Sequence, residues 1–245
     1  MRNQIVILAA GKGTRMGGNV PKVLVMLKNK PLILYLLGQV DKISQLIKPV
    51  IVVGYKAESV KAVLGSDYLY AHQEEQLGTA HALLAAKRKI KAENILVLNG
   101  DIPFIKSESL KALIQMHFRK GGNISITTAQ PKNFKGVYKS LESFGRVIRD
   151  PRHNIAAIVE FKDASSHQKK IKEINAGVYM FNTKWLWGNL EKVKNKNSQK
   201  EYYLTDIIDI AIAGGEKVNS LPIDPQEALG VNSREDLKLA ETLLI

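Results

Sequence analysis

Short apolar segments rich in β-branched residues alternate along the chain with longer segments in which apolar positions recur every three or four residues. The first pattern is typical of buried strands and the second of amphipathic helices. Strands are expected at residues 4–9, 50–53, 68–72, 95–98, 124–128 and 218–222. Helices are expected at residues 31–47, 57–64, 79–90, 107–117, 183–190, 203–213 and 233–244. This alternation predicts an α/β fold with a mainly parallel sheet that is covered on both faces.

The pattern changes after Gln130. Short strands separated by polar turns are expected at residues 146–148, 155–161 and 174–181. We interpret them as an inserted, partly antiparallel region that lies over the sheet. Because no internal repeat and no low-complexity linker is found, the 245 residues are interpreted as one domain with two lobes.

Composition excludes several classes of protein. The chain is 45% hydrophobic, but its longest apolar runs are too short to span a bilayer, and its N-terminus does not resemble a signal peptide. A soluble, cytoplasmic protein without a membrane partner is therefore expected. The absence of cysteine excludes disulfides, thiolate metal sites and a cysteine nucleophile.

The net charge of +13 raises the question of nucleic-acid binding. The lysines are spread along the chain, however, and no recognition motif lies among them. We therefore interpret the charged runs as solvated faces and expect no nucleic-acid partner. A general positive field still attracts an anionic nucleotide or sugar phosphate.

Candidate chemistry begins in the loop after the first expected strand. Its glycines, at positions 11, 13 and 17, match neither a Walker A loop nor a dinucleotide fingerprint. Three cations, Lys12, Arg15 and Lys22, lie in the same short stretch. Glycines let the backbone approach a ligand closely, and cations offset the charge of phosphate. The loop is therefore predicted to bind polyphosphate.

A second polar group, Asn99-Gly-Asp101, follows the expected strand at residues 95–98. In a parallel sheet, ligands gather beyond the carboxyl ends of the strands. We therefore expect this group and the glycine loop to share one cleft. Asp101 alone is also compatible with an ordinary turn aspartate. A hard cation that bridges phosphates needs oxygen ligands such as this carboxylate.

These two motifs and six others resemble, in the same order, those of sugar-nucleotide pyrophosphorylases, specifically the uridylyltransferase domain of the N-acetylglucosamine-1-phosphate enzymes. The matching segments are residues 8–16 with Pro21 and Lys22, then 73–79, 99–103, 145–148, 158–164, 173–177, 201–206 and 230–234. The resemblance implies a three-layer α/β/α, Rossmann-like nucleotide-diphospho-sugar transferase fold, with a mixed, mainly parallel sheet and an inserted sugar-binding lobe. It divides a single nucleotidylyltransferase domain, residues 1–245, into a nucleotide-binding half at about 1–130, a sugar-binding half at about 131–232 and a terminal helix at 233–245.

The activity that the resemblance implies is transfer of a uridylyl group from UTP to N-acetylglucosamine 1-phosphate, with Mg²⁺ as the cofactor. A sugar-phosphate oxygen would attack the α-phosphorus of UTP, and pyrophosphate would leave in line. A phosphate monoester is largely dianionic at pH 7, so this nucleophile needs no general base. Catalysis should then come from positioning and charge neutralisation, for which Arg15 and Lys22 are suited. Lys12 is expected at most to help hold the pyrophosphate.

The resemblance also implies binding roles for residues at matching positions. The nucleotide-binding residues would be Leu8, Ala9, Ala10, Gly11, Gly13, Gln73, Gly78, Thr79 and Gly100, of which Gln73, Gly78 and Thr79 match positions that read uracil. The sugar-binding residues would be Gly145, Glu160, Asn175 and Tyr203. The magnesium ligands would be Asp101 and Asn232. Some residues in these segments also have a structural interpretation: Thr79 and Ser233 are expected to be helix N-caps.

Two departures from the family pattern concern the sugar half. Ala176 replaces a frequent threonine, and Lys200 stands where glycine often precedes the Glu-Tyr-Tyr run. Another sugar 1-phosphate, such as glucose 1-phosphate, or another nucleotide therefore stays open. A cytidylyltransferase of isoprenoid synthesis shares the opening signature, but it usually has glutamine where Val23 stands.

A catalytically silent nucleotide-sensing module is the alternative from another class. Arg15, Lys22, Asp101 and Asn232 together argue against it, because a sensor does not need the full charge-neutralising set. The histidines show no metal-ligand spacing and are interpreted as structural or surface groups. Well-known members of the family carry an acetyltransferase domain of hexapeptide repeats. This sequence contains no such repeats, so no acetyltransferase activity is expected.

Overall fold

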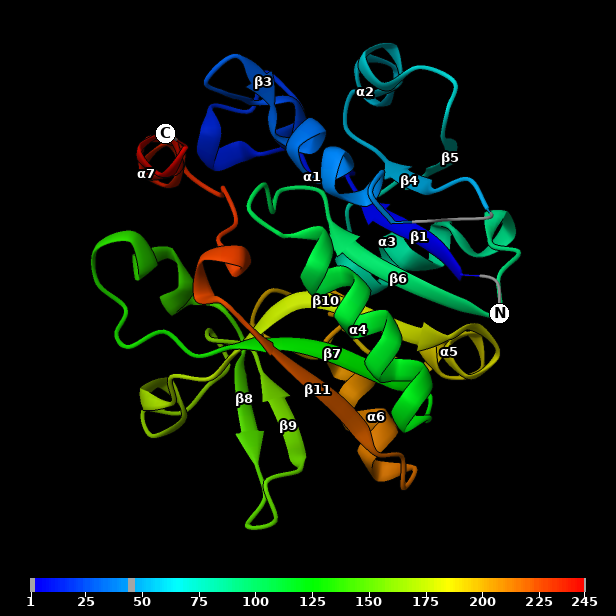
Figure 1. Ribbon diagram of the computed structural model, residues 1–245, viewed down its shortest axis with the longest axis vertical. Helices are drawn as coiled ribbons and strands as arrows, with labels where there is room; N and C mark the ends of the chain where they lie inside the picture. The colour runs from blue at the N-terminus through cyan, green and yellow to red at the C-terminus, as the bar shows by residue number, and fades with distance from the viewer. Residues whose placement is uncertain (1–2, 44–46, 245) are drawn as a thin grey trace.

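The computed structural model describes residues 3–43 and 47–244 (Figure 1). The strands are β1 (Asn3–Leu8), β2 (Met26–Leu27), β3 (Lys30–Pro31), β4 (Val50–Val53), β5 (Leu69–His72), β6 (Asn94–Asn99), β7 (Ile124–Ala129), β8 (Arg146–Arg149), β9 (Ile155–Val159), β10 (Ile174–Asn182) and β11 (Val218–Ile223). The α-helices are α1 (Leu32–Val40), α2 (Ala57–Leu64), α3 (Thr79–Ala85), α4 (Ser107–Lys120), α5 (Thr183–Asn189), α6 (Asp206–Ala213) and α7 (Arg234–Leu243).

The main sheet has the strand order β11-β7-β10-β6-β1-β4-β5, and the hairpin β8–β9 pairs with β10 beside this path (Figure 1). The pairs β1·β4, β1·β6, β4·β5 and β7·β11 are parallel, whereas β10 is antiparallel to both β6 and β7. The expected mixed, mainly parallel sheet is therefore confirmed.

The position of β10 corrects one expectation. Residues 174–181 were expected in an insertion over the sheet, but β10 lies inside the main sheet between β6 and β7. All of its residues except Asn182 are buried. A central antiparallel strand that is covered on both faces has the same continuous apolar pattern as a parallel strand. The apolar pattern therefore could not show where this strand lies.

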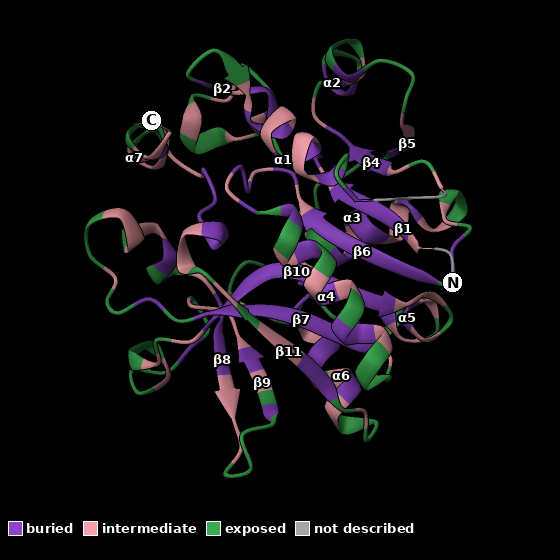
Figure 2. Cartoon of the chain, viewed as in Figure 1, coloured by how far each residue is buried: buried purple, intermediate pink, exposed green. Residues whose placement is uncertain are grey.

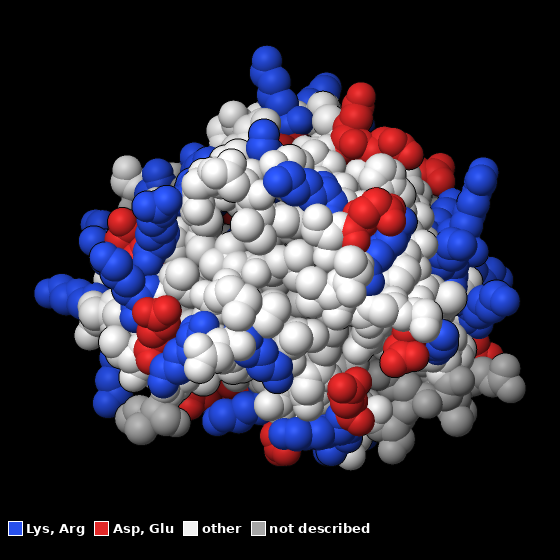
Figure 3. All heavy atoms as spheres, turned by 90° about the horizontal axis from the view of Figure 1, so that it is seen from above, with Lys and Arg blue, Asp and Glu red and all other residues white. Residues whose placement is uncertain are grey.

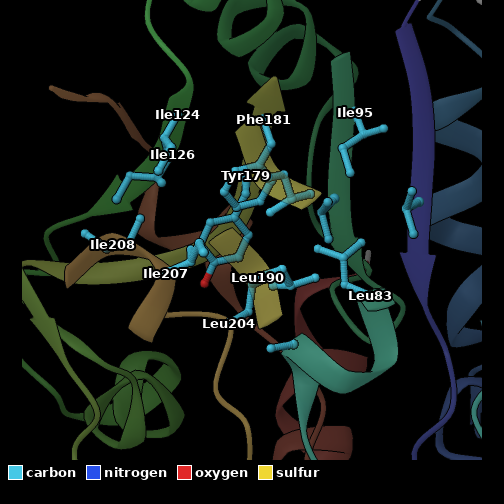
Figure 4. Packing of buried hydrophobic residues seen from close by; sticks show 14 of the residues in the cluster. Leu83, Ile95, Ile124, Ile126, Tyr179, Phe181, Leu190, Leu204, Ile207 and Ile208 are labelled. Atoms are coloured by element: carbon cyan, nitrogen blue, oxygen red, sulfur yellow. The ribbon is translucent and has the colours of Figure 1, made fainter. Parts of the chain in front are cut away.

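Two apolar layers cover the sheet and complete the α/β/α arrangement. On one face, strand residues pack against α3, α5 and α6. Figure 4 shows this packing with side chains from β6, β7, β10, α3 and α6, namely Ile95, Ile124, Ile126, Tyr179, Phe181, Leu83, Ile207 and Ile208. On the other face, the strands pack against α1, α2 and α4. Figure 2 shows that the central strands are buried and that exposed residues lie on the outer helices and loops.

Several helix ends differ from the sequence pattern. The helix expected at residues 31–47 ends at Val40, and residues 44–46 of that prediction lie outside the described residues. The helix expected from residue 203 begins at Asp206. The helix expected at residues 79–90 ends at Ala85, and a 3₁₀ turn at Lys87–Lys89 follows.

The two expected N-caps have different outcomes. Ser233 does cap α7, since its hydroxyl accepts the Asp236 N–H at 3.1 Å. Thr79 is not a cap, because Gly78 occupies that position and the Thr79 hydroxyl accepts the Leu204 N–H at 2.9 Å. A contact with a segment distant in the sequence has therefore replaced the local cap.

Charged side chains are dispersed over the surface. On the face shown in Figure 3, Lys and Arg lie around the rim, interspersed with Asp and Glu, and mostly neutral residues lie between them. Across the described ranges, the helices fall short of the length and apolar character needed to cross a membrane.

Candidate active site

The loop after β1 is held by its own backbone and by close packing. The Met16 N–H donates to the Gly13 carbonyl at 2.9 Å, and the Lys22 N–H donates to the Gly11 carbonyl at 3.3 Å. Gly13 has a φ of +66°, and a Cβ added there would lie 3.1 Å from the Cβ of Lys22. Glycine at position 13 therefore permits both the left-handed turn and the close approach of the Lys22 stem.

The carboxyl ends of β1 and β6 bring the two sequence motifs together. Leu8 lies opposite Asn99 in the parallel register, and the Gly100 N–H donates to the Leu8 carbonyl at 2.9 Å. A Cβ on Gly100 would lie 2.8 Å from a methyl group of Val23. The motif Asn99-Gly-Asp101 can therefore pack against the glycine loop, and residues of both line one cleft, as expected.

This first cleft has a volume of about 360 Å³. The predicted nucleotide-binding residues in its wall are Leu8, Ala9, Ala10, Gly11, Gln73, Gly78 and Thr79. Gly13 and Gly100 are not in the wall, but they shape the backbone behind it, as described above. Lys22, Asp101 and Asn232 also line this cleft, and Gln76 and Glu201 are wall residues that the sequence analysis did not single out.

A second cleft, of about 250 Å³, lies beside the first. The predicted site residues in its wall are Arg15, Gly145, Glu160 and Asn175, together with Asp101 and Asn232. Tyr203 is not in the wall, and its hydroxyl accepts a hydrogen bond from the Gln199 amide at 2.6 Å. The two clefts share Thr79, Asn99, Asp101 and Asn232, so they meet at the predicted metal ligands.

The three cations of the glycine loop lie at different places in the structure. Lys22 lines the first cleft, whereas Arg15 is exposed and lines the second. The ammonium group of Lys12 lies 5.3 Å from the ring centroid of Tyr55, a cation–π distance, and Lys12 lines neither cleft. The sequence placed all three in a single phosphate loop, and only the fold separates them.

Lys22 lies where the clefts meet. Its ammonium group donates to Asp101 Oδ2 and, at 2.5 Å, to Asn232 Oδ1. The Val231 N–H donates to the Asp101 carbonyl at 3.0 Å, and this bond brings the segment before α7 next to β6. The two side-chain oxygens therefore converge on one cation that comes from the glycine loop.

The same oxygens fit a hard divalent cation. Within the described ranges, no three His, Asp or Glu side chains gather into a metal site of their own. A metal ion at this position would therefore have one carboxylate oxygen from Asp101 and one amide oxygen from Asn232 as its protein ligands. Substrate phosphates and water would supply its other ligands. Mg²⁺ commonly binds in this way.

Hydrogen bonds hold the polar groups of the second cleft in place. The Thr205 hydroxyl donates to Glu160 at 2.9 Å, while loss of solvent raises the pKa of the Glu160 carboxyl. The Asn175 amide donates to the Tyr179 hydroxyl at 2.6 Å, and burial raises the pKa of Tyr179. Glu160 and Asn175 are thus held at the positions in which a ligand with hydroxyl groups would meet them. Thr205 was missed as a single residue, although it lies in a matching segment.

Burial and neighbouring carboxylates also raise the pKa of Asp206 to about 6. Asp206 is the first residue of α6, next to Thr205. Its acidic neighbours include Asp209 and Glu160. The ionised form of Asp206 is therefore disfavoured in the folded protein.

Arg146 supports one wall of the second cleft. Its guanidinium is buried between the rings of Phe134 and Phe161, at 4.6 and 4.9 Å from their centroids. It donates to the Phe144 carbonyl at 2.5 Å and to the Glu142 carbonyl at 2.8 Å. Because Ser143, Phe144 and Gly145 line the cleft, Arg146 holds this wall from behind.

Comparison with known proteins shows the family of the chain. Residues 5–172 match the model of the MobA-like NTP transferase domain family. The chain is 41% identical over 244 residues to the bifunctional protein GlmU of Caldicellulosiruptor saccharolyticus, which covers 98% of this chain and 51% of that protein. It is 41% identical over 245 residues to GlmU of Exiguobacterium sibiricum, covering 99% of this chain and 53% of that protein. The chain thus spans about half the length of the curated relatives it matches.

Solved structures show the fold. UDP-glucose pyrophosphorylase complexed with UDP-glucose superposes with a TM-score of 0.78 at 18% identity, covering 99% of this chain and 98% of that chain. The expected nucleotide-diphospho-sugar transferase fold is therefore confirmed. At this identity, the likeness carries no information about substrate.

Proposed function

Since the chain belongs to the MobA-like NTP transferase domain family and is a nucleotidyltransferase, we propose that it transfers a uridylyl group from UTP to N-acetylglucosamine 1-phosphate. The main structural support is the meeting of the two clefts at Asp101 and Asn232. The first cleft contains the residues that match uracil-reading positions, and the second contains Gly145, Glu160 and Asn175, three of the four that match sugar-binding positions. Donor and acceptor would thus enter from two sides, with their phosphates at the junction.

In this proposal, the chain acts by positioning two anions and offsetting their charge. The sugar-phosphate dianion supplies the nucleophilic oxygen, which forms a bond to the α-phosphorus as the bond to pyrophosphate breaks. Arg15, at the second cleft, would neutralise the acceptor phosphate, and Lys22, at the junction, would neutralise the triphosphate. Fixed charges of this kind lower the barrier because they need not reorganise during the reaction.

Asp101 and Asn232 would hold the magnesium ion, whose chemistry is to offset phosphate charge. In this structure, the Lys22 ammonium group contacts both of these oxygens. Lys22 must therefore release them when a metal ion binds there. The lysine and the metal ion would compete for the same two oxygens until substrate phosphates offer Lys22 another partner.

Glu160 and Asn175 would bind hydroxyl or amide groups of the sugar, and Gly145 would let the ring approach the backbone. A Cβ on Gly145 would lie 3.3 Å from the Glu160 carboxylate, so a larger residue would crowd this position. The proposal of an N-acetylated sugar rests on the resemblance of the motifs to N-acetylglucosamine-1-phosphate uridylyltransferases, and identity of 41% to two GlmU proteins supports it. We also propose that the protein works in the cytoplasm, where UTP is made available to such enzymes.

A substrate panel tests the proposal. Sugar 1-phosphates are combined with UTP, CTP or dTTP in the presence of Mg²⁺, and pyrophosphate release is followed in a coupled assay. The expected result is a kcat/KM for UTP with N-acetylglucosamine 1-phosphate well above that of every other pair. Preference for glucose 1-phosphate would contradict the proposed sugar. Nucleotide binding without pyrophosphate release from any pair would indicate a sensor instead of an enzyme.

A further inference from the structure

The amide of Gln73 is held from behind by two acceptors. Gln73 is only 3% exposed, and it lines the first cleft. Its Nε2 donates to the Gly78 carbonyl at 3.2 Å and lies 3.0 Å from Nδ1 of His81. A carbonyl oxygen can only accept, so the amide nitrogen must face this side. Nδ1 of His81 is then also an acceptor, and the imidazole carries its proton on Nε2.

This arrangement determines which atom of Gln73 is left for a ligand. An amide nitrogen has two hydrogens, and both are used by Gly78 and His81. Across the described ranges, no hydrogen bond occupies the Gln73 carbonyl oxygen, Oε1. Gln73 therefore offers the first cleft an acceptor and no side-chain donor.

An acceptor in this place distinguishes between pyrimidines. Opposite ring position N3, a carbonyl oxygen accepts the N–H of uracil, whereas the unprotonated N3 of cytosine would place two lone pairs against each other. A half-turn of the amide would reverse the preference, because Nε2 would then face the base. That half-turn would place Oε1 against the Gly78 carbonyl, which can only accept, and against Nδ1 of His81, which could donate to it only after the imidazole proton had moved from Nε2 to Nδ1.

We propose that His81 is a positioning residue that holds Gln73 in the orientation selective for uracil over cytosine; this inference rests on the proposed use of UTP. Gly78 contributes through its backbone carbonyl, which any residue at position 78 would have. His81 is therefore the side chain that reinforces this orientation, by accepting the second hydrogen of the amide. His81 lies on α3, and its ring centroid is 6.4 Å from that of Tyr202.

The proposal is tested by kcat/KM for UTP and for CTP, each with the same sugar 1-phosphate. His81→Ala removes one of the two acceptors and should lower the UTP:CTP ratio about tenfold, the effect of about one hydrogen bond. His81→Asn keeps an acceptor near the position of Nδ1 and should restore most of the ratio. His72→Ala is the matched control, because His72 is exposed, contacts Glu74 and lines neither cleft. Its ratio should equal that of the parent.

The outcomes separate this inference from the proposed function. A parent enzyme without a preference for UTP would overturn the proposed function, and this inference with it. If the parent prefers UTP and His81→Ala loses activity with UTP and CTP in equal proportion, His81 is merely structural and the inference is wrong. A KM for the sugar phosphate that stays at the parent value, together with a reduced UTP:CTP ratio, would support it. Should His81→Ala fail to fold, an unchanged ratio in His81→Leu would refute the inference in the same way.

Discussion

Lys22→Met should increase the affinity of the protein for a divalent metal ion in the absence of nucleotide. The substitution keeps an unbranched stem against Gly13 but removes the ammonium group that contacts Asp101 and Asn232. Both oxygens then become available to a metal ion without displacement of a competing cation. If Lys22 only bound phosphate, the substitution would leave metal affinity unchanged.

The magnitude follows from the two contacts that the metal ion must replace. Hydrogen bonds between charged groups contribute about 1.5 to 3 kcal/mol, and pairs near solvent lie at the lower end. The side chains of Lys22 and Asp101 are 18% and 16% exposed, so water partly screens this pair. Removing a competitor worth about 1.5 kcal/mol should lower the Kd for the metal ion about tenfold.

Mn²⁺ provides the readout, because its free form can be followed by electron paramagnetic resonance during a titration of the nucleotide-free protein. Arg15→Met is the matched control, since Arg15 contacts neither oxygen and should leave the Kd near the parent value. Asp101→Asn should weaken Mn²⁺ binding. Equal Mn²⁺ affinity in the parent and in Lys22→Met, with Asp101→Asn still weakened, would refute competition between lysine and metal. In turnover assays, Lys22→Met should be slower by a few hundred-fold, as expected for loss of a transition-state contact of about 3 to 4 kcal/mol.

Three other predictions concern Arg146, Asp206 and Lys200. Arg146→Met should lower the free energy of unfolding by about 2 to 3 kcal/mol, because the carbonyls of Phe144 and Glu142 lose their donor. It should also raise the KM for the sugar phosphate more than the KM for the nucleotide. Equal changes in the two KM values would contradict the role of Arg146 in supporting the wall of the second cleft. Asp206→Asn should stabilise the protein by about 1 to 2 kcal/mol at pH 8, since a pKa raised to about 6 means that the ionised carboxyl is disfavoured in the folded state. This gain should shrink as the pH falls through 6 and vanish below the ordinary aspartate pKa of 3.8, where both states are protonated. Thermal denaturation across this range would show a constant gain if the reasoning is wrong. Lys200 has a φ of +55°, so Lys200→Gly should relieve left-handed strain and raise stability by about 0.5 to 1 kcal/mol, with a higher Tm as the measure and a lower Tm as the contrary result.

The left-handed backbone of Lys200 also explains one departure from the family pattern. Glycine is frequent at that position because it adopts a positive φ without a Cβ penalty. Lysine accepts the same conformation here at an energetic cost. This departure therefore concerns backbone strain and does not by itself change the sugar that the second cleft would accept.

Much of the fold follows from local patterns in the sequence. Strand β4 and helix α2 have the expected bounds. A short run of β-branched residues specifies the strand, and an amphipathic helical pattern specifies the helix. The glycine loop and Asn99-Gly-Asp101 share a cleft, as expected, since both follow parallel strands that end at the same edge of the sheet. The bounds of β4 and α2 depend on residues that are close together in the chain, whereas the shared cleft also depends on the parallel pairing of β1 with β6.

Other features depend on partners that are far apart in the sequence, and only the tertiary structure decided them. Nothing local shows that β10 enters the main sheet, or that Arg15 and Lys22 of one loop line different clefts. The contact of Lys22 with Asn232 and the orientation of the Gln73 amide are likewise set by groups that the fold brings together. Sequence patterns specify which residues are present and their local backbone, whereas the hydrogen-bond partner of a side chain depends on packing across the whole domain.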